Sequence, residues 1–449
     1  MMLYFYNLSI FLLFFILPIA GTNGLRYLLA LMLLLMPLLT LYQNSHRIKK
    51  LNFKNEFFKI LLFLFLLSVA IFIHTIFLSR DISYSLSEYR AHWLTPIIFF
   101  CVGLITVLNY RLRGYDFRNI VNSIFYGAFL NICFLFGGVI ADFFLKNGNI
   151  LYKNMGLTDS PVNLSYLVSY IILLLFAEVM ARRYTSFKCL WGSNNLIYIF
   201  LIFSIIGVFL IGQRLGVLIL VLILFISFSS ILKKIRKKLI SAISIFGISF
   251  FALIPLSLNI HSSWDGFTET FFVAIDTENY PTWKTRNMGD LPLKSNNEQH
   301  NSSNYERIAW FKKGLDYIVQ YPEGYGFGRN IFGHIMEDEE GIDSVRGFHS
   351  HSGIIDLTLG IGVLGLIAWI LFNLKIIRYF INTSNESHLF YSLFGYGYVF
   401  IFLFRSFGDS NIRDHMFQEF MLIISIFLTI FYFINSEYEK NSPNKRKQN

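Results

Sequence analysis

The sequence predicts an all-α polytopic membrane protein with about 12 transmembrane helices. Hydrophobic residues make up 55% of the chain and charged residues only 15%, and the mean hydropathy is +0.53. Apolar runs of roughly 20 residues recur along the chain, and each is long enough to cross the hydrocarbon core of a bilayer. Basic residues gather in the loops after every second run, as expected for a chain that crosses the membrane repeatedly.

The predicted spans are ordered by length and by exclusion of charge. The first has no basic residue before it and no small-residue cleavage site after it, so we expect a retained helix and not a removed signal peptide. The seventh and eighth are short and separated by hardly any loop. The spans lie at 2–20, 25–43, 60–79, 93–109, 120–142, 164–181, 196–212, 214–232, 239–258, 351–373, 389–406 and 417–434.

The basic loops predict the orientation of the chain. Loops after even-numbered spans are the basic ones, for example Lys233, Lys234 and Arg236, and the positive-inside rule places them in the cytoplasm. The C-terminal tail, 435–449, is basic as well, so both termini are expected inside. The net charge of +10 is therefore a topology signal, and we predict no nucleic-acid partner.

This orientation divides the chain into four parts. Residues 1–258 hold the first nine spans, 259–350 form one large loop on the outer face, 351–434 hold the last three spans, and 435–449 form the tail. The three cysteines lie in or beside spans or on the inner side, so no disulfide is expected in the outer loop.

The outer loop changes character at about residue 303. The stretch 281–303 is rich in Asn and Ser and is expected to have little apolar surface to bury. After it, Ser303 and Glu306 have capping-box spacing, and apolar residues at helical spacing continue until Pro322. This pattern predicts an amphipathic helix outside the membrane, with Arg307 in its first turn, where the helix dipole favours an anion.

Three arginines on the outer face are candidates for binding an anion, and each has a structural alternative. Arg214 falls at the boundary between two spans, where an arginine is costly unless it meets water, a counter-charge or a ligand. For Arg307 the alternative is a solvated or snorkelling side chain, which is the usual state of an arginine on an exposed amphipathic helix. Arg90 precedes a span, where arginine commonly anchors a helix.

Two histidines, His349 and His351, stand at the mouth of the tenth span. His351 is predicted to begin that helix, whose dipole disfavours protonation, so a neutral ring could accept a proton at physiological pH. A structural hydrogen-bonding role is the alternative. The span also carries Gly360, Gly362 and Gly365, at a spacing that lets another helix approach closely.

Searches for other chemistry find little. The chain has no Walker-type phosphate loop, no GxGxxG after a strand, no HExxH and no CxxC, and no acidic pair on the outer face that predicts a metal site. We therefore expect neither a metal nor a cofactor.

The combined pattern resembles the O-antigen ligases, within the group that also holds O-antigen polymerases and protein O-oligosaccharyltransferases. The family signature of His, then Asn, Ser or Gln, nine residues, Gly, two residues and Gly is met by His351, Ser352, Gly362 and Gly365. An Arg, three residues, Leu signature is met by Arg214 and Leu218. A third feature, an arginine at the start of an extracytoplasmic helix that ends in a Pro and a Gly-rich turn, is similar to Arg307 through the sequence YPEGYGFG.

The resemblance implies a GT-C-like glycosyltransferase in the inner membrane of a Gram-negative bacterium, with its active site facing the periplasm. The donor would be a polysaccharide on undecaprenyl diphosphate and the acceptor a sugar hydroxyl of the lipid A core oligosaccharide, among inner-membrane lipids. His351 would be the base, and Arg214 and Arg307 would stabilise the departing diphosphate. Arg90, His349 and Ser352 would contact substrate.

Two alternatives stay open at this point. A polymerase or protein O-oligosaccharyltransferase would use the same lipid-linked donor and the same arginine chemistry. A transporter or flippase is less consistent with the sequence, because a carrier is expected to hold charges near the middle of the bilayer on broken helices, whereas these spans are nearly free of internal charge.

Overall fold

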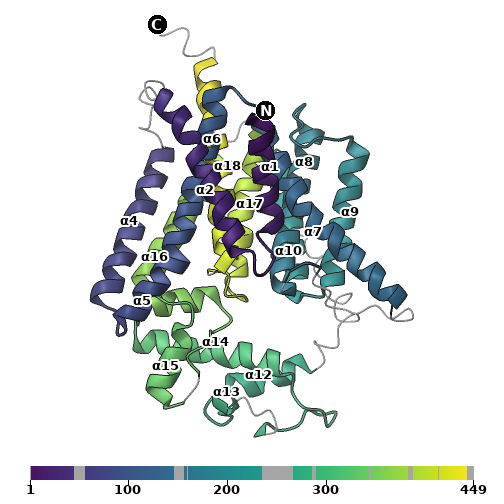
Figure 1. Ribbon diagram of the computed structural model, residues 1–449. Coiled ribbons are helices and arrows are strands. Elements are labelled where there is room, and N and C mark those ends of the chain that lie inside the picture. The colour runs from purple at the N-terminus through teal and green to yellow at the C-terminus, as the bar shows by residue number, and fades with distance from the viewer. Residues whose placement is uncertain are drawn as a thin grey trace.

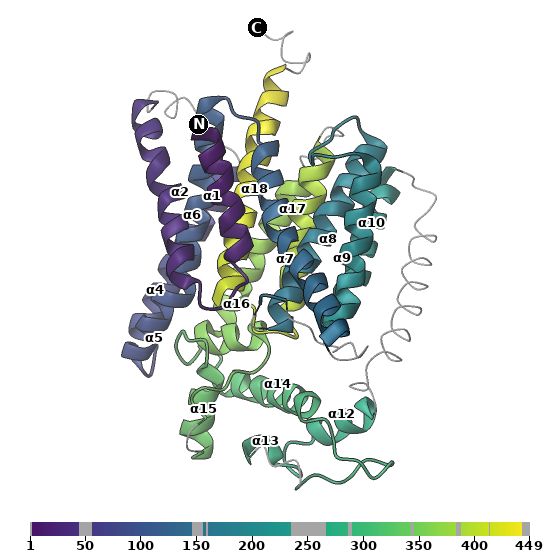
Figure 2. The ribbon, with the colours of Figure 1, turned by 45° about the vertical axis from the view of Figure 1, so that its right-hand side comes forward.

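The computed structural model describes residues 2–44, 56–145, 156–158, 160–234, 266–285, 290–342, 345–382, 388–412 and 414–441. Every regular element in this part of the chain is a helix, so the predicted all-α class is confirmed. The helices form an elongated bundle with a smaller helical layer at one end (Figures 1 and 2).

The bundle helices reproduce the predicted apolar spans. Eight helices are long and apolar enough to cross a membrane, and three more, at Met2–Ile16, Arg214–Ile226 and Leu389–Arg405, are apolar but shorter. The protein is therefore a multi-pass membrane protein, while the count of twelve stays a prediction. The predicted span 239–258 lies outside the described residues.

The bundle elements are α1 (Met2–Ile16), α2 (Asn23–Gln43), α4 (Glu56–Phe77), α5 (Ile82–Tyr89), the π turn η1 (Arg90–Leu94), α6 (Thr95–Arg113), α7 (Arg118–Leu145), α8 (Pro161–Tyr184), α9 (Asn194–Ile211), α10 (Arg214–Lys234), α16 (Gly353–Asn382), α17 (Leu389–Arg405) and α18 (Asp414–Asn441).

Burial separates central from peripheral helices in the bundle. The apolar segments of α8 and α18 are 89% and 94% buried, whereas those of α4 and α7 are 28% buried. A helix that is apolar all round and buried belongs to the centre of a bundle, and an apolar helix with exposed sides is suited to contact lipid. Both central helices also line a polar cavity, α8 through Val162 and Asn163 and α18 through Met416 and Gln418.

A second layer of helices covers one end of the bundle, opposite the start of α1 and the last turns of α18 (Figure 2). It consists of α12 (Phe267–Ile275), α13 (Thr282–Thr285), α14 (Ser302–Gln320) and α15 (Ile331–Glu340). This layer has its own aromatic core, which includes Trp283, Tyr305 and Trp310. The expectation that 281–303 buries little is wrong in part, because Trp283 is 1% exposed and its carbonyl accepts from Trp310 Nε1 at 3.1 Å.

The amphipathic helix expected after residue 303 is present as α14, with two corrections. Its N-cap is Asn301, whose side chain accepts from the backbone N–H of Asn304, and not Ser303. Consequently Arg307 lies in the second turn of the helix and not in the first. An asparagine three residues before a backbone N–H caps as well as serine does, so spacing alone did not distinguish the two residues.

The signature glycine Gly362 breaks α16 rather than packing it against another helix. Gly362 has φ 73° and ψ 172°, a conformation that L side chains rarely adopt. Two backbone groups on either side of this break bond to the turn after α14. Val363 N donates to Pro322 O at 2.8 Å, and Leu359 O accepts from Tyr325 N at 2.7 Å. The outer layer is thereby joined to a bundle helix through backbone hydrogen bonds.

Candidate functional site

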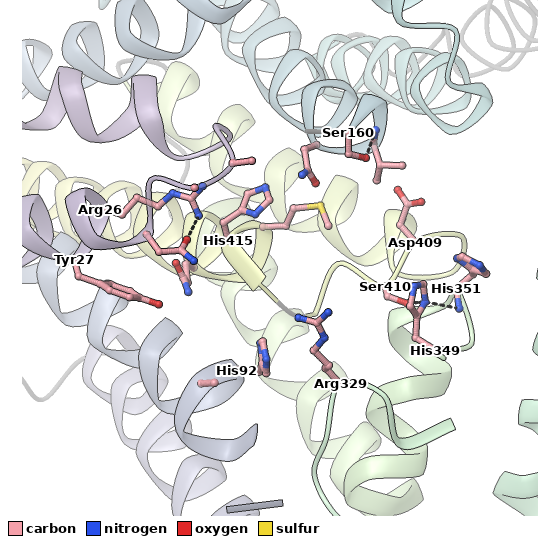
Figure 3. Close-up of a pocket in the computed structure, with 18 of the residues that line it drawn as sticks. Arg26, Tyr27, His92, Ser160, Arg329, His349, His351, Asp409, Ser410 and His415 are labelled. Carbon is pink, nitrogen blue, oxygen red and sulfur yellow. Dashed lines mark hydrogen bonds between the residues drawn. The ribbon is translucent and has the colours of Figure 1, made fainter. Parts of the chain in front are cut away.

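A polar cavity of about 670 Å³ lies between the bundle and the outer layer. The α1–α2 turn, η1, the start of α8, α14, and the loops before α16 and α18 all contribute to its lining. His349, His351 and Ser410 gather on one side of the cavity, and Arg26 and Tyr27 lie on the other (Figure 3). The ionisable side chains among the described lining residues are Arg26, Tyr27, His92, Arg307, Arg329, His349, His351, Asp409 and His415.

His351 lies in this cavity with its ring held in a defined orientation. The imidazole stacks on Trp310 of α14, with ring centroids 5.4 Å apart and an interplanar angle of 7°. Trp310 is itself buried and bonded through Nε1 to Trp283 O. His351 does not begin α16, as the sequence suggested, because the helix starts at Gly353. The residue has φ 60°, a conformation that non-glycine residues seldom adopt and that is enriched at functional sites.

His349 lines the same cavity next to His351. The two rings lie edge to face, with centroids 4.3 Å apart. His349 Nδ1 accepts from the backbone N–H of His351 at 3.2 Å and lies 3.1 Å from Ser410 Oγ. The turn 349–351 therefore presents both imidazoles to one cavity.

Arg307 reaches the cavity from α14 and meets the α17–α18 loop. Its Nη1 donates to Gly408 O at 2.8 Å and lies 3.7 Å from Asp409 Oδ1. The second oxygen of Asp409 is 2.8 Å from Nε of Arg405, which is fully buried. Asp409 thus sits between two arginines, and it holds Arg307 at the cavity wall while 37% of the Arg307 side chain stays exposed.

Arg214 is the first residue of α10 and is not among the described residues that line the cavity. Its Nη2 donates to Asn304 Oδ1 at 2.6 Å. Asn304 precedes Arg307 by about one turn of α14, so Arg214 contacts the helix that carries Arg307. The structure therefore brings the two predicted arginines to one helix but places only Arg307 on the cavity.

Arg90 and Ser352 do not belong to the described lining of the cavity either. Arg90 is exposed at the start of η1, and the next two residues, Ala91 and His92, line the cavity in its place. Ser352 is 1% exposed, and its Oγ donates to Ser406 O at 3.1 Å and accepts from Ile355 N at 3.4 Å. Its position is that of a helix N-cap tied to the end of α17.

Several cavity residues were not predicted as site residues from the sequence. Arg329 follows the Gly-rich turn, and its backbone N–H donates to Glu88 Oε2 at 2.8 Å, which ties that turn to α5. Glu88 Oε2 also lies 3.8 Å from Nε2 of His92. Asp409 and Ser410 come from the short α17–α18 loop, which has no motif, and His415 comes from the start of α18. The only available signal was that this loop is polar and lies on the predicted outer face.

The cavity combines cationic donors with imidazoles. Guanidinium groups form paired, charge-assisted hydrogen bonds with phosphate oxygens, and a neutral imidazole accepts a proton from a hydroxyl near neutral pH. Within the described part of the chain, no group of three or more His, Cys, Asp or Glu side chains is arranged to hold a metal ion.

A comparison with known protein families finds one match in the second half of the chain. Residues 199–370 match the family model described as O-antigen ligase, and no curated protein matches the chain. The matched segment runs from α9 to the middle of α16 and contains Arg214, Arg307, His349 and His351. The resemblance indicated by the motifs is thus confirmed, and the chain carries the O-antigen ligase family domain over residues 199–370.

Proposed function

We propose that this protein is an O-antigen ligase that transfers a polysaccharide from undecaprenyl diphosphate to a sugar hydroxyl of the lipid A core oligosaccharide. The observation that carries the proposal is that Arg307 and His351 line one cavity. That cavity thereby holds a group able to stabilise a departing diphosphate beside a group able to accept a proton. The family match over 199–370 supports the same reaction class.

The proposed reaction is a direct displacement at the anomeric carbon of the donor sugar. The oxygen of the acceptor hydroxyl forms the new glycosidic bond, while the bond between the anomeric carbon and the diphosphate oxygen breaks. The proton of the acceptor hydroxyl moves to His351, and undecaprenyl diphosphate leaves with the bonding electron pair. Attack from the side opposite the leaving group inverts the anomeric configuration.

Charge stabilisation is assigned to the arginine of the cavity wall. Negative charge grows on the diphosphate as its bond to the sugar breaks, and preorganised cationic donors are most effective where charge develops in the transition state. Arg307 is held in place by Gly408 O and Asp409, so little reorganisation is needed when the diphosphate departs. We propose that the reaction is metal-independent, and we expect purified protein to keep its activity in EDTA. Activity that is lost in EDTA and restored by magnesium or manganese would contradict this part of the proposal.

We assign the cavity to the periplasmic side of a Gram-negative inner membrane. The basic loops predict this orientation, and the outer layer lies at the end of the bundle opposite the start of α1 (Figure 2). Asn297 is exposed in that layer. In a cysteine-free background, N297C should react with an impermeant maleimide in whole cells whose outer membrane has been permeabilised. Labelling that requires a broken inner membrane would reverse the orientation.

A gene deletion in a host that makes smooth lipopolysaccharide tests the reaction itself. We expect lipopolysaccharide without long chains, together with full-length polysaccharide that accumulates on undecaprenyl diphosphate. A core that carries a single repeat unit would indicate a polymerase and overturn the ligase assignment. Unchanged lipopolysaccharide with an underglycosylated protein would indicate a protein O-oligosaccharyltransferase.

A further inference from the structure

A buried carboxylate, Asp356, lies behind the two histidines in the first turn of α16. Its side chain is 7% exposed. Asp356 Oδ1 accepts from the backbone N–H of Ser350 at 2.9 Å, and Oδ2 accepts from Ser410 Oγ at 2.8 Å. A buried carboxylate is costly unless hydrogen bonds compensate it, and these bonds connect the loop before α16 to the α17–α18 loop. The carboxylate thereby joins the two loops that present His349 and Asp409 to the cavity.

The hydrogen bonds around His349 determine which ring nitrogen carries the proton. The backbone N–H of His351 can only donate, and it points at His349 Nδ1 from 3.2 Å, so Nδ1 must offer its lone pair. A neutral ring assigned from this hydrogen-bond pattern carries its proton on Nε2. Ser410 has a single hydroxyl proton, which lies between two acceptors, Asp356 Oδ2 at 2.8 Å and His349 Nδ1 at 3.1 Å. A proton shared between these acceptors keeps Nδ1 an acceptor and connects the ring to the carboxylate.

We propose that Asp356 and Ser410 are positioning residues that hold His349 as a hydrogen-bond donor, and that His349 Nε2–H binds a diphosphate oxygen of the lipid-linked substrate. This inference rests on the proposed function. It assigns the adjacent imidazoles opposite tasks, since His351 accepts a proton from the acceptor hydroxyl and His349 donates a hydrogen bond to the leaving group. Asp356 is connected to the ring of His349 through Ser350 and Ser410, and the described lining of the large cavity does not include it.

The charged surroundings of His349 agree with a donor role. Arg307 of α14 and Arg329 of the Gly-rich turn line the same cavity, as do Asp409 of the α17–α18 loop and His415 at the start of α18. Two guanidinium groups attract an anion to this region, and a neutral N–H adds a directional contact without further cationic repulsion. A hydrogen bond to a charged partner contributes about ten- to hundred-fold in affinity.

The first test replaces His349 with residues that keep or remove an N–H near the position of Nε2. The side-chain amide of glutamine supplies such a donor, and alanine does not. We expect H349A to bind undecaprenyl diphosphate at least about ten-fold more weakly than wild type, and H349Q to stay within about three-fold. At His351, by contrast, glutamine should not restore turnover, because an amide is not a base. A loss of affinity in H349Q equal to that in H349A overturns the donor role.

The second test asks whether Asp356 acts through His349. D356N retains the shape of the side chain, but its single amide oxygen can replace only one of the two carboxylate acceptors, and its NH2 group faces the other donor. We expect about ten-fold weaker binding of undecaprenyl diphosphate. In the H349A background the same substitution should have no further effect on affinity. Equal weakening in both backgrounds would show that Asp356 has a merely structural role and would overturn the inference.

Two controls keep these outcomes interpretable. T358V alters a buried hydroxyl on the same helix, bonded to Ile354 O, and should leave affinity within about two-fold. If D356N unfolds in detergent, S410A takes its place with the same expected dependence on His349. Wild-type protein that fails to bind undecaprenyl diphosphate would overturn the proposed function, whereas wild-type binding with equal losses in H349Q and H349A overturns this inference alone.

Discussion

The cavity has a bundle wall that carries Arg26 and an outer wall that carries Arg307 and His351, and the arginines of the two walls differ in their partners and exposure. On the bundle wall, Arg26 is 5% exposed, and its guanidinium donates to Thr22 Oγ1, Asn23 Oδ1 and the carbonyl of Ile19. On the outer wall, Arg307 donates to Gly408 O, pairs with Asp409 and stays 37% exposed. An arginine whose donors bond to its own turn stabilises that turn, whereas one that keeps exposed donors is suited to bind an anion.

The walls also differ in how they are built. Arg26 is fixed by residues within seven positions of it in the sequence. The outer wall depends on contacts between distant segments, such as Arg307 with Gly408 and His351 with Trp310. Substitutions on the outer wall should therefore affect chemistry, and those on the bundle wall should affect stability.

The largest effect on turnover is expected from His351→Ala. A general base commonly contributes about a hundred- to ten-thousand-fold in rate, so transfer should nearly cease while affinity for the lipid-linked substrate changes little. A purified assay that measures substrate binding and turnover separately checks this prediction. A defect found wholly in binding would assign the ring of His351 to diphosphate contact.

Arg307→Lys should have the next largest effect. Lysine keeps the charge but lacks the planar fork of donors, and the loss of one preorganised donor to a developing anion costs about a hundred-fold in turnover. Arg346→Lys is the matched control, because Arg346 is exposed and pairs with Glu337 away from the cavity. Wild-type turnover in R307K would return Arg307 to the solvated role that its sequence context also allows.

Arg214→Lys should have a smaller effect, because Arg214 contacts Asn304 and is not on the described cavity lining. We expect about a ten-fold loss of turnover, the usual scale for one charge-assisted hydrogen bond. Asn304→Ala should produce a similar loss, and the double variant should be no worse than either single one. Additive losses in the kinetic assay would mean that Arg214 contacts substrate independently of Asn304.

Arg26→Gln tests the bundle wall. Because the Arg26 donors are bonded within the α1–α2 turn, we expect a loss of about 1–3 kcal/mol in stability, seen as a lower Tm in thermal unfolding. Turnover of the folded fraction should fall by no more than a few-fold. A large turnover defect without a change in Tm would remove the distinction between the two walls.

Arg90→Ala should have the smallest effect. The side chain is exposed and lies outside the described cavity lining, and substitutions at such positions usually change stability by less than about 0.5 kcal/mol. Turnover should stay within about two-fold of wild type. His92→Ala, two residues later and on the cavity, is the informative comparison, and equal defects in the two variants would place Arg90 at the substrate after all.

Much of the architecture followed from the sequence because it depends on local patterns. Apolar runs predicted the bundle helices, including the tight connection between α9 and α10 that holds Arg214. Helical spacing predicted α14, although with its N-cap two residues too late. The motifs also identified His351 and Arg307, because the order of the spans is enough to place both residues on the same face of the membrane.

The tertiary structure decided which candidates share the cavity. Gly362 occupies a signature position, but its role as a break in α16 could not be predicted. That role depends on the turn at Pro322–Tyr325, which bonds to α16 beside the break and lies about 40 residues away in the sequence. Asp409, Ser410 and Arg329 reach the cavity through loops without periodicity, and Arg214 and Ser352 turn to partners on neighbouring helices. The helices, their apolar faces and the residue types at the site could be predicted from local sequence patterns, because these depend on neighbours along the chain. Packing between distant segments determined which side chains meet, because the hydrogen bonds that orient Arg307 and His349 join residues 101 and 61 positions apart.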